Sequence, residues 1–473
     1  MTLRGPRFFN TLGRDYQDFA PTRQGEARIY TCGPTVYNHV HIGNLRTFAF
    51  EDLLRRSLTL LGYRVTQVMN LTDVDDKTIR GAQAAGVGLD EFTAPFIASF
   101  FEDLDTLHIQ RAEVYPRATE HVAAMIEMIE ILLAKGFAYV SDGSVWFRIA
   151  QDKDYGNLSG FDLESARQGE RVASDEYEKE DVRDFVLWKA HKEGEPSWSS
   201  PWGAGRPGWH IECSAMSRKY LGDTFDIHCG AVDNIFPHHE NEIAQSESAT
   251  GKTFVKFWLH AEHLIVDGEK MSKSLGNQYT LKDLLARGCS PRALRYLFLS
   301  VHYRQKLNFS FESLEAAGNA LRRIDEMRFR LQHAPKKEPA SPRVSQAVAA
   351  VAEDVAAALA DDLNVSKALA AIFGFVREAN ACIEAGEIGS GDAERIVAAL
   401  AAADRVFGVL DPAAWSTDNA AAGDDGEIER LVRERSDARV RRDFAASDRL
   451  RSELAARGVV IEDTPQGTRW KRT

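Results

Sequence analysis

Cysteine is scarce in this sequence. Among 473 residues there are five cysteines, at positions 32, 213, 229, 289 and 382. Their number is odd, they lie far apart, and no Cys-x-x-Cys pair is present. This pattern argues against a secreted disulfide framework and against a zinc knuckle formed by neighbouring residues.

Long apolar runs and an excess of positive charge are also missing. No run approaches the ~18 apolar residues of a membrane span, and the first 26 residues contain no signal-peptide core. We therefore expect a soluble, cytoplasmic protein with no membrane partner. The net charge of −12 argues against a basic coat protein for nucleic acid. Residues 427–473 nevertheless carry 12 Lys or Arg against 9 Asp or Glu, which indicates a polyanionic partner at this end.

The first part of the chain has the pattern of an α/β nucleotide-binding unit. Residues 28–32 and 65–69 are predicted strands, and residues 45–61 between them place apolar side chains at helical spacing. A second α/β pattern follows, with predicted strands at residues 224–228 and 263–266 on either side of a helix. The sequence thus predicts a Rossmann-type fold that is split by an insertion.

The rest of the chain is predicted to be loops and helices. Residues 176–208 are rich in Trp, Pro and Gly and are predicted loops. Ser290-Pro291 is a typical helix start, residues 344–410 are rich in Ala, and the last fifteen residues are predicted strands.

The predicted fold class is α/β. It comprises a split Rossmann-type catalytic domain with an inserted connective segment, then a helical bundle and a small C-terminal α+β domain. The expected segments are the first catalytic half (1–80), the insertion (81–205), the second catalytic half (206–290), the helical bundle (291–411), a linker (412–426) and the C-terminal domain (427–473).

The motif His41-Ile42-Gly43-Asn44 follows the first predicted strand and begins a helix. Free backbone N–H groups and the helix dipole favour phosphate at such a position, and Gly43 allows a close approach to the backbone. His41 could donate to a phosphate on which negative charge develops. A surface histidine at a helix start would give the same four residues, so the motif alone is not specific.

A second motif is Lys270-Met271-Ser272-Lys273-Ser274, in a predicted loop followed by Gly276. Two lysines around a serine suit a mobile clamp on a triphosphate. A solvated loop with two lysines has the same composition, but the five-residue string is much more specific than its composition.

The order of these two motifs on a split nucleotide-binding fold resembles the class I aminoacyl-tRNA synthetases. The flanking segments resemble the cysteinyl enzymes of that class. These segments are YTCGPTVY (30–37), NLTDVDDK (70–77), GWHIECSAM (208–216), FPHHENE (236–242) and EDTPQGT (462–468). The resemblance covers the whole chain and implies that residues 291–411 contact the tRNA stem and residues 427–473 bind the anticodon. Asn44 stands where the family usually has a second histidine; asparagine keeps a donor but cannot be cationic.

The resemblance implies one zinc ion per chain, bound by Cys32, Cys213, His238 and Glu242. Soft thiolates and imidazole suit Zn²⁺. Only the i, i+4 spacing of His238 and Glu242 supports the set independently, since isolated cysteines are usually small core residues. A zinc-bound substrate thiol would separate cysteine from serine without editing. Cys229 falls outside the matching set and is expected to be buried and inert.

The resemblance also implies the substrate contacts. Asp233 would pair with the α-ammonium of cysteine and Trp209 would wall the pocket; a turn residue and a core tryptophan are the alternatives. The full expected cysteine-binding set is Gly33, Thr72, Trp209 and Asp233. The expected ATP-binding set is His41, Gly43, Asn44, Lys270, Ser272 and Lys273, of which His41, Lys270 and Lys273 are catalytic, with Mg²⁺ on the phosphates.

The basic C-terminal segment is the expected tRNA contact. Arginine can pair with phosphates or bases, and an aromatic ring can stack on an unstacked anticodon base. The residues expected to bind tRNA are Arg439, Phe444, Asp448 and Trp470. A solvated helix with paired Arg and Asp side chains is the alternative.

The expected reaction is ATP-dependent activation of L-cysteine to cysteinyl-adenylate, followed by transfer to the 3′ end of the cysteine tRNA. The protein is expected to be a monomer. One alternative is a cysteine ligase with an amino-sugar acceptor, against which the segment 427–473 argues. The other is a non-catalytic tRNA-binding paralogue, against which the two intact nucleotide motifs argue.

Overall fold

The structure, a computed structural model, describes residues 5–161, 184–272, 275–334, 340–415, 425–457, 459–464 and 467–472. The chain divides into two units, Met1–Asp411 and Pro412–Thr473, and each is described by itself.

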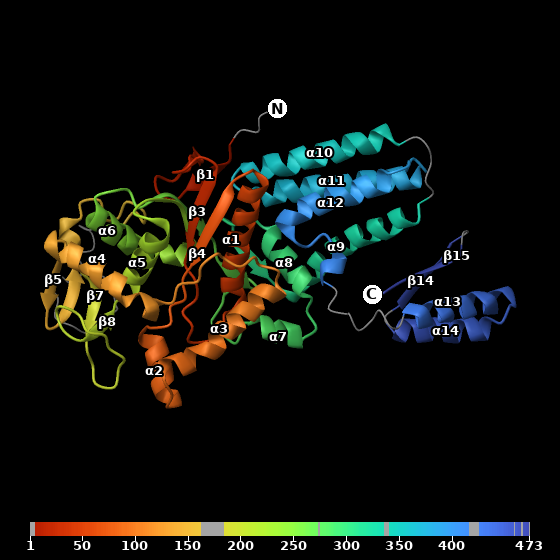
Figure 1. Cartoon of the computed structure of the whole chain (residues 1–473). Helices are drawn as coiled ribbons and strands as arrows, with labels where there is room; N and C mark the ends of the chain where they lie inside the picture. The colour runs from red at the N-terminus through yellow and green to blue at the C-terminus, as the bar shows by residue number, and fades with distance from the viewer. Residues whose placement is uncertain are drawn as a thin grey trace. The chain divides into compact units, whose positions relative to one another are not determined.

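A four-stranded parallel sheet lies at the centre of the first unit, in the order β10-β9-β3-β4. The strands are β3 (Glu26–Thr31), β4 (Arg64–Met69), β9 (Phe225–Ala231) and β10 (Val255–Ala261). Helices α1 (Ile42–Leu60) and α5 (Trp209–Leu221) lie on opposite sides of the strands (Figure 1). Because helices cover both faces, β9 and β10 are buried almost along their whole length, and β3 and β4 are buried toward their carboxyl ends. Helix α6 (Glu240–Thr250) connects β9 to β10.

This sheet confirms the split Rossmann-type fold, with one correction. The strands predicted at residues 28–32, 65–69 and 224–228 are β3, β4 and β9. The strand that pairs with β9 after the helix is β10, which the sequence analysis missed. The predicted strand at residues 263–266 is β11 (Leu264–Val266), which belongs to a separate sheet. β10 is buried on both faces and therefore lacks the alternation of polar and apolar residues that marks a half-exposed strand.

Helices and an antiparallel sheet lie between β4 and α5, in the region where the sequence predicts the insertion. The sheet has the order β5-β6-β7-β8. The elements are α2 (Asp76–Ala85), α3 (Leu89–Thr106), α4 (Val122–Ala134), β5 (Ala138–Ser141), β6 (Ser144–Phe147), β7 (Phe185–Ala190) and β8 (Gly205–Pro207). The prediction of loops over residues 176–208 is wrong where β7 and β8 lie. The apolar residues of β7 form a strand because they pair with β6 and β8, although turn-forming residues surround them in the sequence.

Two small sheets and two short helices also belong to the first unit. The elements are β1 (Arg7–Asn10) with β2 (Asp15–Asp18), β11 with β12 (Glu269–Lys270) and β13 (Leu307–Phe309), and helices α7 (Leu281–Ala286) and α8 (Pro291–Ser300). Helix α8 begins as predicted, because Ser290 Oγ accepts from the Ala293 N–H at 3.3 Å and Pro291 occupies the first turn.

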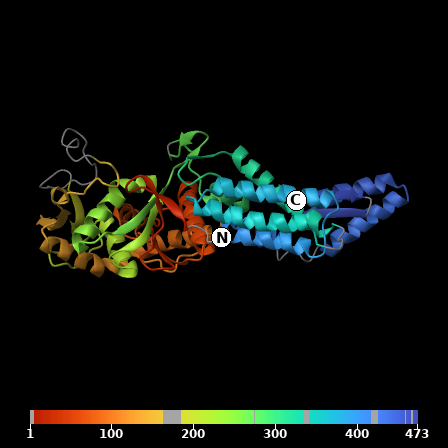
Figure 2. The ribbon, with the colours of Figure 1, turned by 90° about the horizontal axis from the view of Figure 1, so that it is seen from above.

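A bundle of long helices ends the first unit. Its helices are α9 (Phe311–Gln332), α10 (Pro342–Ala360), α11 (Val365–Glu384) and α12 (Asp392–Phe407). Figure 2 shows α10, α11 and α12 side by side, which confirms the predicted helical character of residues 344–410. The fully buried Arg295 of α8 links this bundle to α1, since it donates to Asp52 at 2.6 Å and to the Phe407 carbonyl at 2.7 Å.

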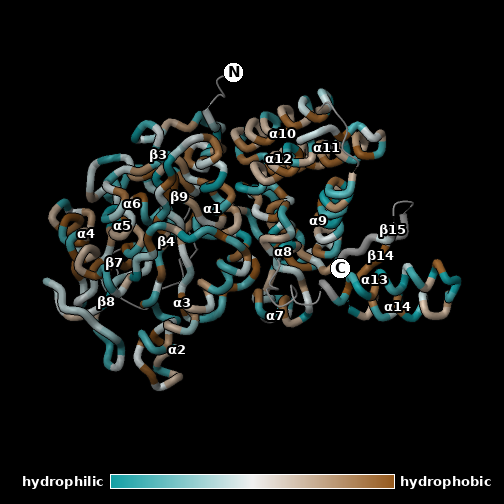
Figure 3. The backbone as a smooth tube through the Cα atoms, turned by 45° about the vertical axis from the view of Figure 1, so that its right-hand side comes forward, coloured by the Kyte–Doolittle hydropathy of each residue, from teal (hydrophilic) through white to brown (hydrophobic). Residues whose placement is uncertain are grey.

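The second unit is a helical hairpin followed by a strand hairpin. Its elements are α13 (Asp425–Val440), α14 (Phe444–Ala456), β14 (Val459–Thr464) and β15 (Gly467–Arg472). Hydrophilic residues dominate the two helices (Figure 3), and Ile428, Leu431 and Leu454 form its small core. None of the helices in the described ranges is long and apolar enough to cross a membrane.

Candidate functional site

The candidate site begins where the parallel strands end. Cys32 and Gly33 follow β3, Thr72 lies three residues beyond β4, and Asp233 lies two residues beyond β9. Carboxyl ends of parallel strands share one edge of a sheet, where ligands of such folds bind. The topology therefore brings together residues as far apart in the sequence as Cys32 and Asp233.

Four predicted metal ligands meet at this edge. One ligand atom from each of Cys32, Cys213, His238 and Glu242 lies within 4.8 Å of the others. Cys213 comes from α5 and Glu242 from α6, whereas His238 lies in the turn just before α6. His238 Nε2 contacts Glu242 Oε1 at 3.0 Å, so the i, i+4 spacing does bring this pair together.

The charges of this cluster suit a divalent cation. The Cys32 thiol donates a hydrogen bond that lowers the pKa of Cys213 to about 6, whereas burial raises the pKa of Cys32 well above its usual value. Burial lowers the pKa of His238, but Glu242 and Cys213 outweigh burial and raise it to about 10. Burial raises the pKa of Glu242, but His228 and His238 outweigh it and hold it at about 2. A cation that displaced the His238 proton would meet a thiolate, a carboxylate and an imidazole.

A second layer of histidines supports the cluster, and the sequence analysis missed it. His228 Nε2 contacts Glu242 Oε2 at 3.0 Å, and His239 Nε2 contacts Cys32 Sγ at 3.2 Å. His239 Nδ1 in turn contacts His260 Nε2 at 2.8 Å. Partners of this kind fix the orientation of metal ligands. Since these histidines come from β9, β10 and the turn before α6, only the His238-His239 pair was visible as a local signal.

The second layer also forms an alternative ligand set. Cys32, His228, His239 and Glu242 likewise place one atom each within 4.8 Å of the others. The pKa of His239 lies well below its usual value, because the ring is buried and lies beside His228 and His260. His228, His239 and His238 are all buried. The ring of the exposed Trp209 stacks on His238 at a centroid distance of 4.2 Å. The predicted set is therefore the one that lies beside the solvent-exposed tryptophan.

Gly33 and Thr72 are joined by a buried network. A Cβ atom on Gly33 would lie 1.8 Å from the Asn70 carbonyl oxygen, so only glycine fits here. The Gly33 N–H donates to Asn70 Oδ1 at 2.9 Å, and Asn70 Nδ2 donates to Thr72 Oγ1 at 3.1 Å. The Thr72 hydroxyl donates to Glu212 Oε2 at 3.1 Å. Burial raises the pKa of Glu212 well above its usual value.

Trp209 and Asp233 are both exposed to solvent. Trp209 is 42% exposed, which rules out the alternative of a core tryptophan. The Asp233 side chain is 65% exposed, and its Oδ1 lies 2.7 Å from His263 Nε2. No local pattern in the sequence indicates His263 as a site residue.

The two nucleotide motifs are in contact. The Ile42 N–H donates to the Tyr279 carbonyl at 2.9 Å, and a Cβ on Gly43 would lie 2.6 Å from Met271 Cε. Lys270 lies in β12 and is exposed, and Ser272 Oγ accepts from the Leu275 N–H at 3.2 Å. Lys273 lies outside the described residues. The tertiary fold thus places the segment around Lys270–Ser272 against the start of α1.

The start of α1 differs from the expectation of free N–H groups. His41 is the N-cap, and its Nδ1 accepts from the N–H groups of Gly43 at 3.1 Å and Asn44 at 3.3 Å. Asn44 Oδ1 reciprocally accepts from the His41 N–H at 3.3 Å. Asn44 therefore closes a capping box. Because Nδ1 accepts, the ring proton of neutral His41 lies on Nε2, which is the atom able to donate to a ligand.

The expected tRNA residues lie in the second unit. Arg439 lies in the last turn of α13, Phe444 begins α14, and Asp448 lies one turn further on; all three are exposed. The Phe444 side chain is 64% exposed. Trp470 lies in β15 opposite Ile461, and its side chain is outside the described part of the chain.

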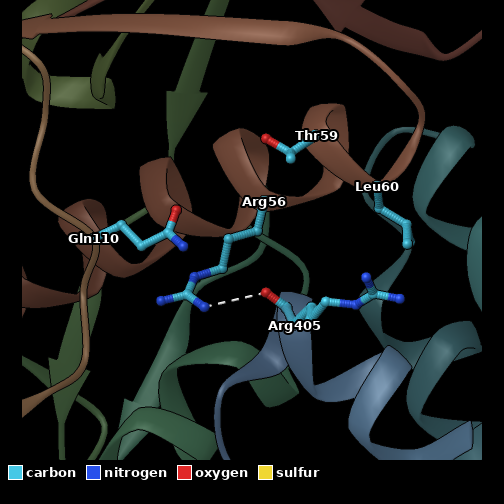
Figure 4. A pocket seen from close by; sticks show the side chains of 5 residues that line it. All are labelled: Arg56, Thr59, Leu60, Gln110 and Arg405. Carbon is cyan, nitrogen blue, oxygen red and sulfur yellow. Dashed lines mark hydrogen bonds between the residues drawn. The ribbon is translucent and has the colours of Figure 1, made fainter. Parts of the chain in front are cut away.

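A separate cavity of about 390 Å³ lies at the other end of α1 (Figure 4). It is lined by Arg56, Thr59, Leu60, Gln110 and Arg405. Arg56 donates to the Arg405 carbonyl at 3.1 Å and forms an ion pair with Asp52 at 2.8 Å. Arg56 lies roughly 22 Å along α1 from His41, at a rise of about 1.5 Å per residue. This cavity is therefore distinct from the candidate site.

Comparisons with known proteins agree with this arrangement. Residues 18–319 match the family model of the class I (C) tRNA synthetase catalytic domain, residues 354–411 match the DALR domain, and residues 423–470 match the cysteinyl-tRNA ligase anticodon binding domain. A cysteine–tRNA ligase of Protochlamydia amoebophila is 49% identical over 98% of both chains. One of Solibacter usitatus is 48% identical over 98% of this chain and 99% of its own.

Solved structures show the same fold at low identity. Methionyl-tRNA synthetase of Mycobacterium tuberculosis, in complex with methionyl-adenylate, has a TM-score of 0.57 and 17% identity, covering 82% of this chain and 90% of its own. A leucyl-tRNA synthetase of Agrobacterium radiobacter has a TM-score of 0.59 and 12% identity, covering 85% and 86%. The matched family models and the full-length relatives show that the chain belongs to the cysteine–tRNA ligase family of class I aminoacyl-tRNA synthetases.

Proposed function

We propose that this protein is a ligase that activates L-cysteine with ATP and transfers it to the 3′ end of the cysteine tRNA. The observation that carries the proposal is the Cys32, Cys213, His238 and Glu242 cluster at the sheet edge. The contact between the start of α1 and Met271 supports it. The full-length relatives are cysteine–tRNA ligases, and the matched anticodon-binding model argues against an amino-sugar acceptor.

The metal that best fits the cluster is zinc. Two sulfurs, an imidazole and a carboxylate are donor types that Zn²⁺ accepts. Bound there, zinc would supply a Lewis acid that takes the substrate thiolate directly, which a serine hydroxyl or a methyl group cannot match. An apolar pocket alone would separate such side chains by only ~1–3 kcal/mol. The four residues therefore account for selectivity without an editing domain.

The remaining substrate contacts are assigned to residues around the cluster. Asp233 accepts a hydrogen bond from the α-ammonium group, and Trp209 walls the pocket above His238. Gly33 and Thr72 orient the rest of the amino acid, and the network through Asn70 and Glu212 holds both in place. The carboxylate of cysteine is thereby presented to ATP.

Adenylate formation is an attack of this carboxylate on the α-phosphorus, with pyrophosphate as the leaving group. No protein nucleophile is needed, so the protein contributes positioning and charge stabilisation. His41 donates from Nε2 to the phosphate, while Lys270 and Lys273 neutralise charge on the triphosphate, which is accompanied by Mg²⁺. The other residues assigned to ATP binding are Gly43, Asn44 and Ser272. Asn44 acts through the His41 cap, not as a cation.

Transfer requires a bound tRNA, for which the second unit is the proposed anticodon contact. Phe444 stacks on a base, and Arg439, Asp448 and Trp470 provide polar and further aromatic contacts. We also propose that the protein acts as a monomer in the cytoplasm.

Two assays test the function. The first is pyrophosphate exchange with cysteine, serine or alanine as the substrate, with serine and alanine expected to be inactive. The second is charging of a cysteine tRNA transcript, with a non-cognate transcript as the control. Exchange without charging would refute the tRNA ligase assignment, and equal exchange with serine would refute the role of the cluster in selectivity.

A further inference from the structure

His263 lies between two carboxylates, just beyond the carboxyl ends of β9 and β10. Its Nε2 lies 2.7 Å from Asp233 Oδ1, and its Nδ1 lies 2.8 Å from Glu262 Oε1. We propose that His263 is a positioning residue that holds the Asp233 carboxylate in place for the α-ammonium group of the substrate amino acid. This inference rests on the proposed function. It adds to the amino-acid site a residue that lies outside both nucleotide motifs and outside the segments that resemble the cysteinyl enzymes.

The location of Asp233 makes such support necessary. Asp233 lies in a short turn directly after β9, and its side chain is 65% exposed. Within the described ranges, His263 is the one hydrogen-bond partner found for this carboxylate. An exposed Asp in a turn samples several rotamers, and fixing one of them costs entropy when a ligand binds. A partner that fixes the rotamer beforehand lowers this cost.

The main chain of His263 is itself firmly held. Its N–H donates to Glu262 Oε1 at 2.9 Å, and its carbonyl accepts from Arg46 at 2.8 Å and from the Leu307 N–H at 3.1 Å. Arg46 is buried in α1, two residues after Asn44, and also donates to the Gln305 carbonyl at 2.5 Å. His263 is therefore tied to the helix that begins with the first nucleotide motif.

Glu262 fixes the ring of His263. Burial raises the pKa of Glu262, but the hydrogen bonds from the main chain and ring of His263 outweigh burial and lower it. Each ring nitrogen of His263 thus faces a carboxylate oxygen, Nδ1 that of Glu262 and Nε2 that of Asp233. Because His263 contacts Oδ1 of Asp233, we assign Oδ2 to the ammonium group of the substrate.

Two amide substitutions separate the two ring nitrogens. The amide nitrogen of Asn corresponds to Nδ1, so His263→Asn keeps the contact with Glu262 and loses the contact with Asp233. The amide nitrogen of Gln corresponds to Nε2, so His263→Gln keeps the contact with Asp233. The matched control is His333→Asn, because His333 is exposed and its ring contacts only the Phe329 carbonyl at 2.8 Å among hydrogen bonds described.

The experiment measures pyrophosphate exchange, inhibition by 3-mercaptopropionate and thermal unfolding. That inhibitor has the thiol and carboxylate of cysteine but no amino group. His263→Asn is expected to raise the KM for cysteine about tenfold, as for one lost hydrogen bond to a charged group. The KM for ATP, the Tm and the inhibition constant of 3-mercaptopropionate should stay unchanged. His263→Gln should restore the KM for cysteine to within about threefold of the wild type, and His333→Asn should not alter it.

A double variant completes the test. In an Asp233→Asn background, His263→Asn should have no further effect on the KM for cysteine, because the two residues act through one contact. An additive effect, an unchanged KM in His263→Asn, or equal weakening of 3-mercaptopropionate would overturn this inference alone. Wild-type protein without cysteine-dependent exchange would overturn the proposed function and this inference with it.

Discussion

Gly43 and Met271 touch across the two nucleotide motifs. A Cβ on Gly43 would lie 2.6 Å from Met271 Cε and 3.0 Å from the His41 ring atom Cε1. The start of α1 and the segment after β12 therefore share one packed surface, although 228 positions separate them in the sequence. Any side chain at position 43 has to move Met271, His41 or both.

The substitution Gly43→Ala tests this contact. The end of a methionine side chain is flexible, so we expect the fold to be retained with an unchanged Tm. Displacement of Met271 and His41 should lower kcat in pyrophosphate exchange by up to about 10²-fold, as for a misplaced catalytic group. The matched control is Gly318→Ala in α9, where the new methyl group meets only the Ala293 Cβ at 4.0 Å. Equal activity of both variants would argue against a role for the contact.

Loss of one metal ligand should remove both zinc and selectivity. Cys213→Ala deletes one of two sulfurs from the cluster, and the stoichiometry of bound zinc should fall from about one per chain toward zero, since three remaining ligands bind the metal far less tightly. Metal analysis measures the zinc, and exchange with cysteine against serine measures selectivity. Cys289→Ala is the control, because Cys289 lies in the loop before α8. Full zinc content in Cys213→Ala would contradict the predicted ligand set.

The exposed ring of Phe444 predicts a defect confined to the tRNA step. Phe444→Ala should weaken tRNA binding by about 1–3 kcal/mol, the usual contribution of one stacked base. The KM for tRNA in charging should rise accordingly, while pyrophosphate exchange should not change. Val460→Ala in β14 removes another exposed apolar side chain of the same unit and serves as the control. A loss of exchange activity in Phe444→Ala would show that the effect is not confined to tRNA.

The buried pair of Asp52 and Arg295 predicts a pH-dependent contribution to stability. Burial raises the pKa of Asp52, but Arg295 and Arg56 outweigh burial and hold it below its usual value. Asp52→Asn should therefore lower the free energy of unfolding by about 3–5 kcal/mol at pH 7, because it leaves a buried guanidinium without its counter-ion. A carboxylate whose pKa is lowered by folding stabilises the folded protein in full at any pH above the pKa it has in the unfolded chain, which is about 3.9. This stabilisation is lost as the pH falls through the pKa of the folded state.

Denaturant unfolding of the wild type and Asp52→Asn at several pH values checks this prediction. The difference between them should be constant from pH 5 to 7, using about 3.9 as the unfolded pKa, and should shrink in more acid solution. The exposed pair of Asp105 and Arg111 supplies the control, since Asp105→Asn should change the stability little. A difference that grows as the pH falls would contradict the sign of the pKa shift.

Local patterns in the sequence determined much of the architecture. The apolar spacing of residues 45–61 predicts α1, and Ser290-Pro291 predicts the start of α8, because helical period and capping depend on neighbouring residues. The segments matched to the cysteinyl enzymes supplied the four proposed metal ligands. Only the pair His238 and Glu242 had a spacing that argued for proximity by itself.

The tertiary structure decided which strands pair and which distant residues come into contact, because local sequence patterns contain no information on either. It showed β10 as the partner of β9, since a strand buried on both faces has no alternation to reveal it. It also placed His228, His239 and His260 beside the proposed metal ligands and His263 beside Asp233, because the carboxyl ends of parallel strands converge only once the sheet has formed. The sequence by itself determined which chemical groups are present and to which family the chain belongs. The fold decided which of those groups touch, because contacts across 200 residues depend on packing and not on sequence spacing.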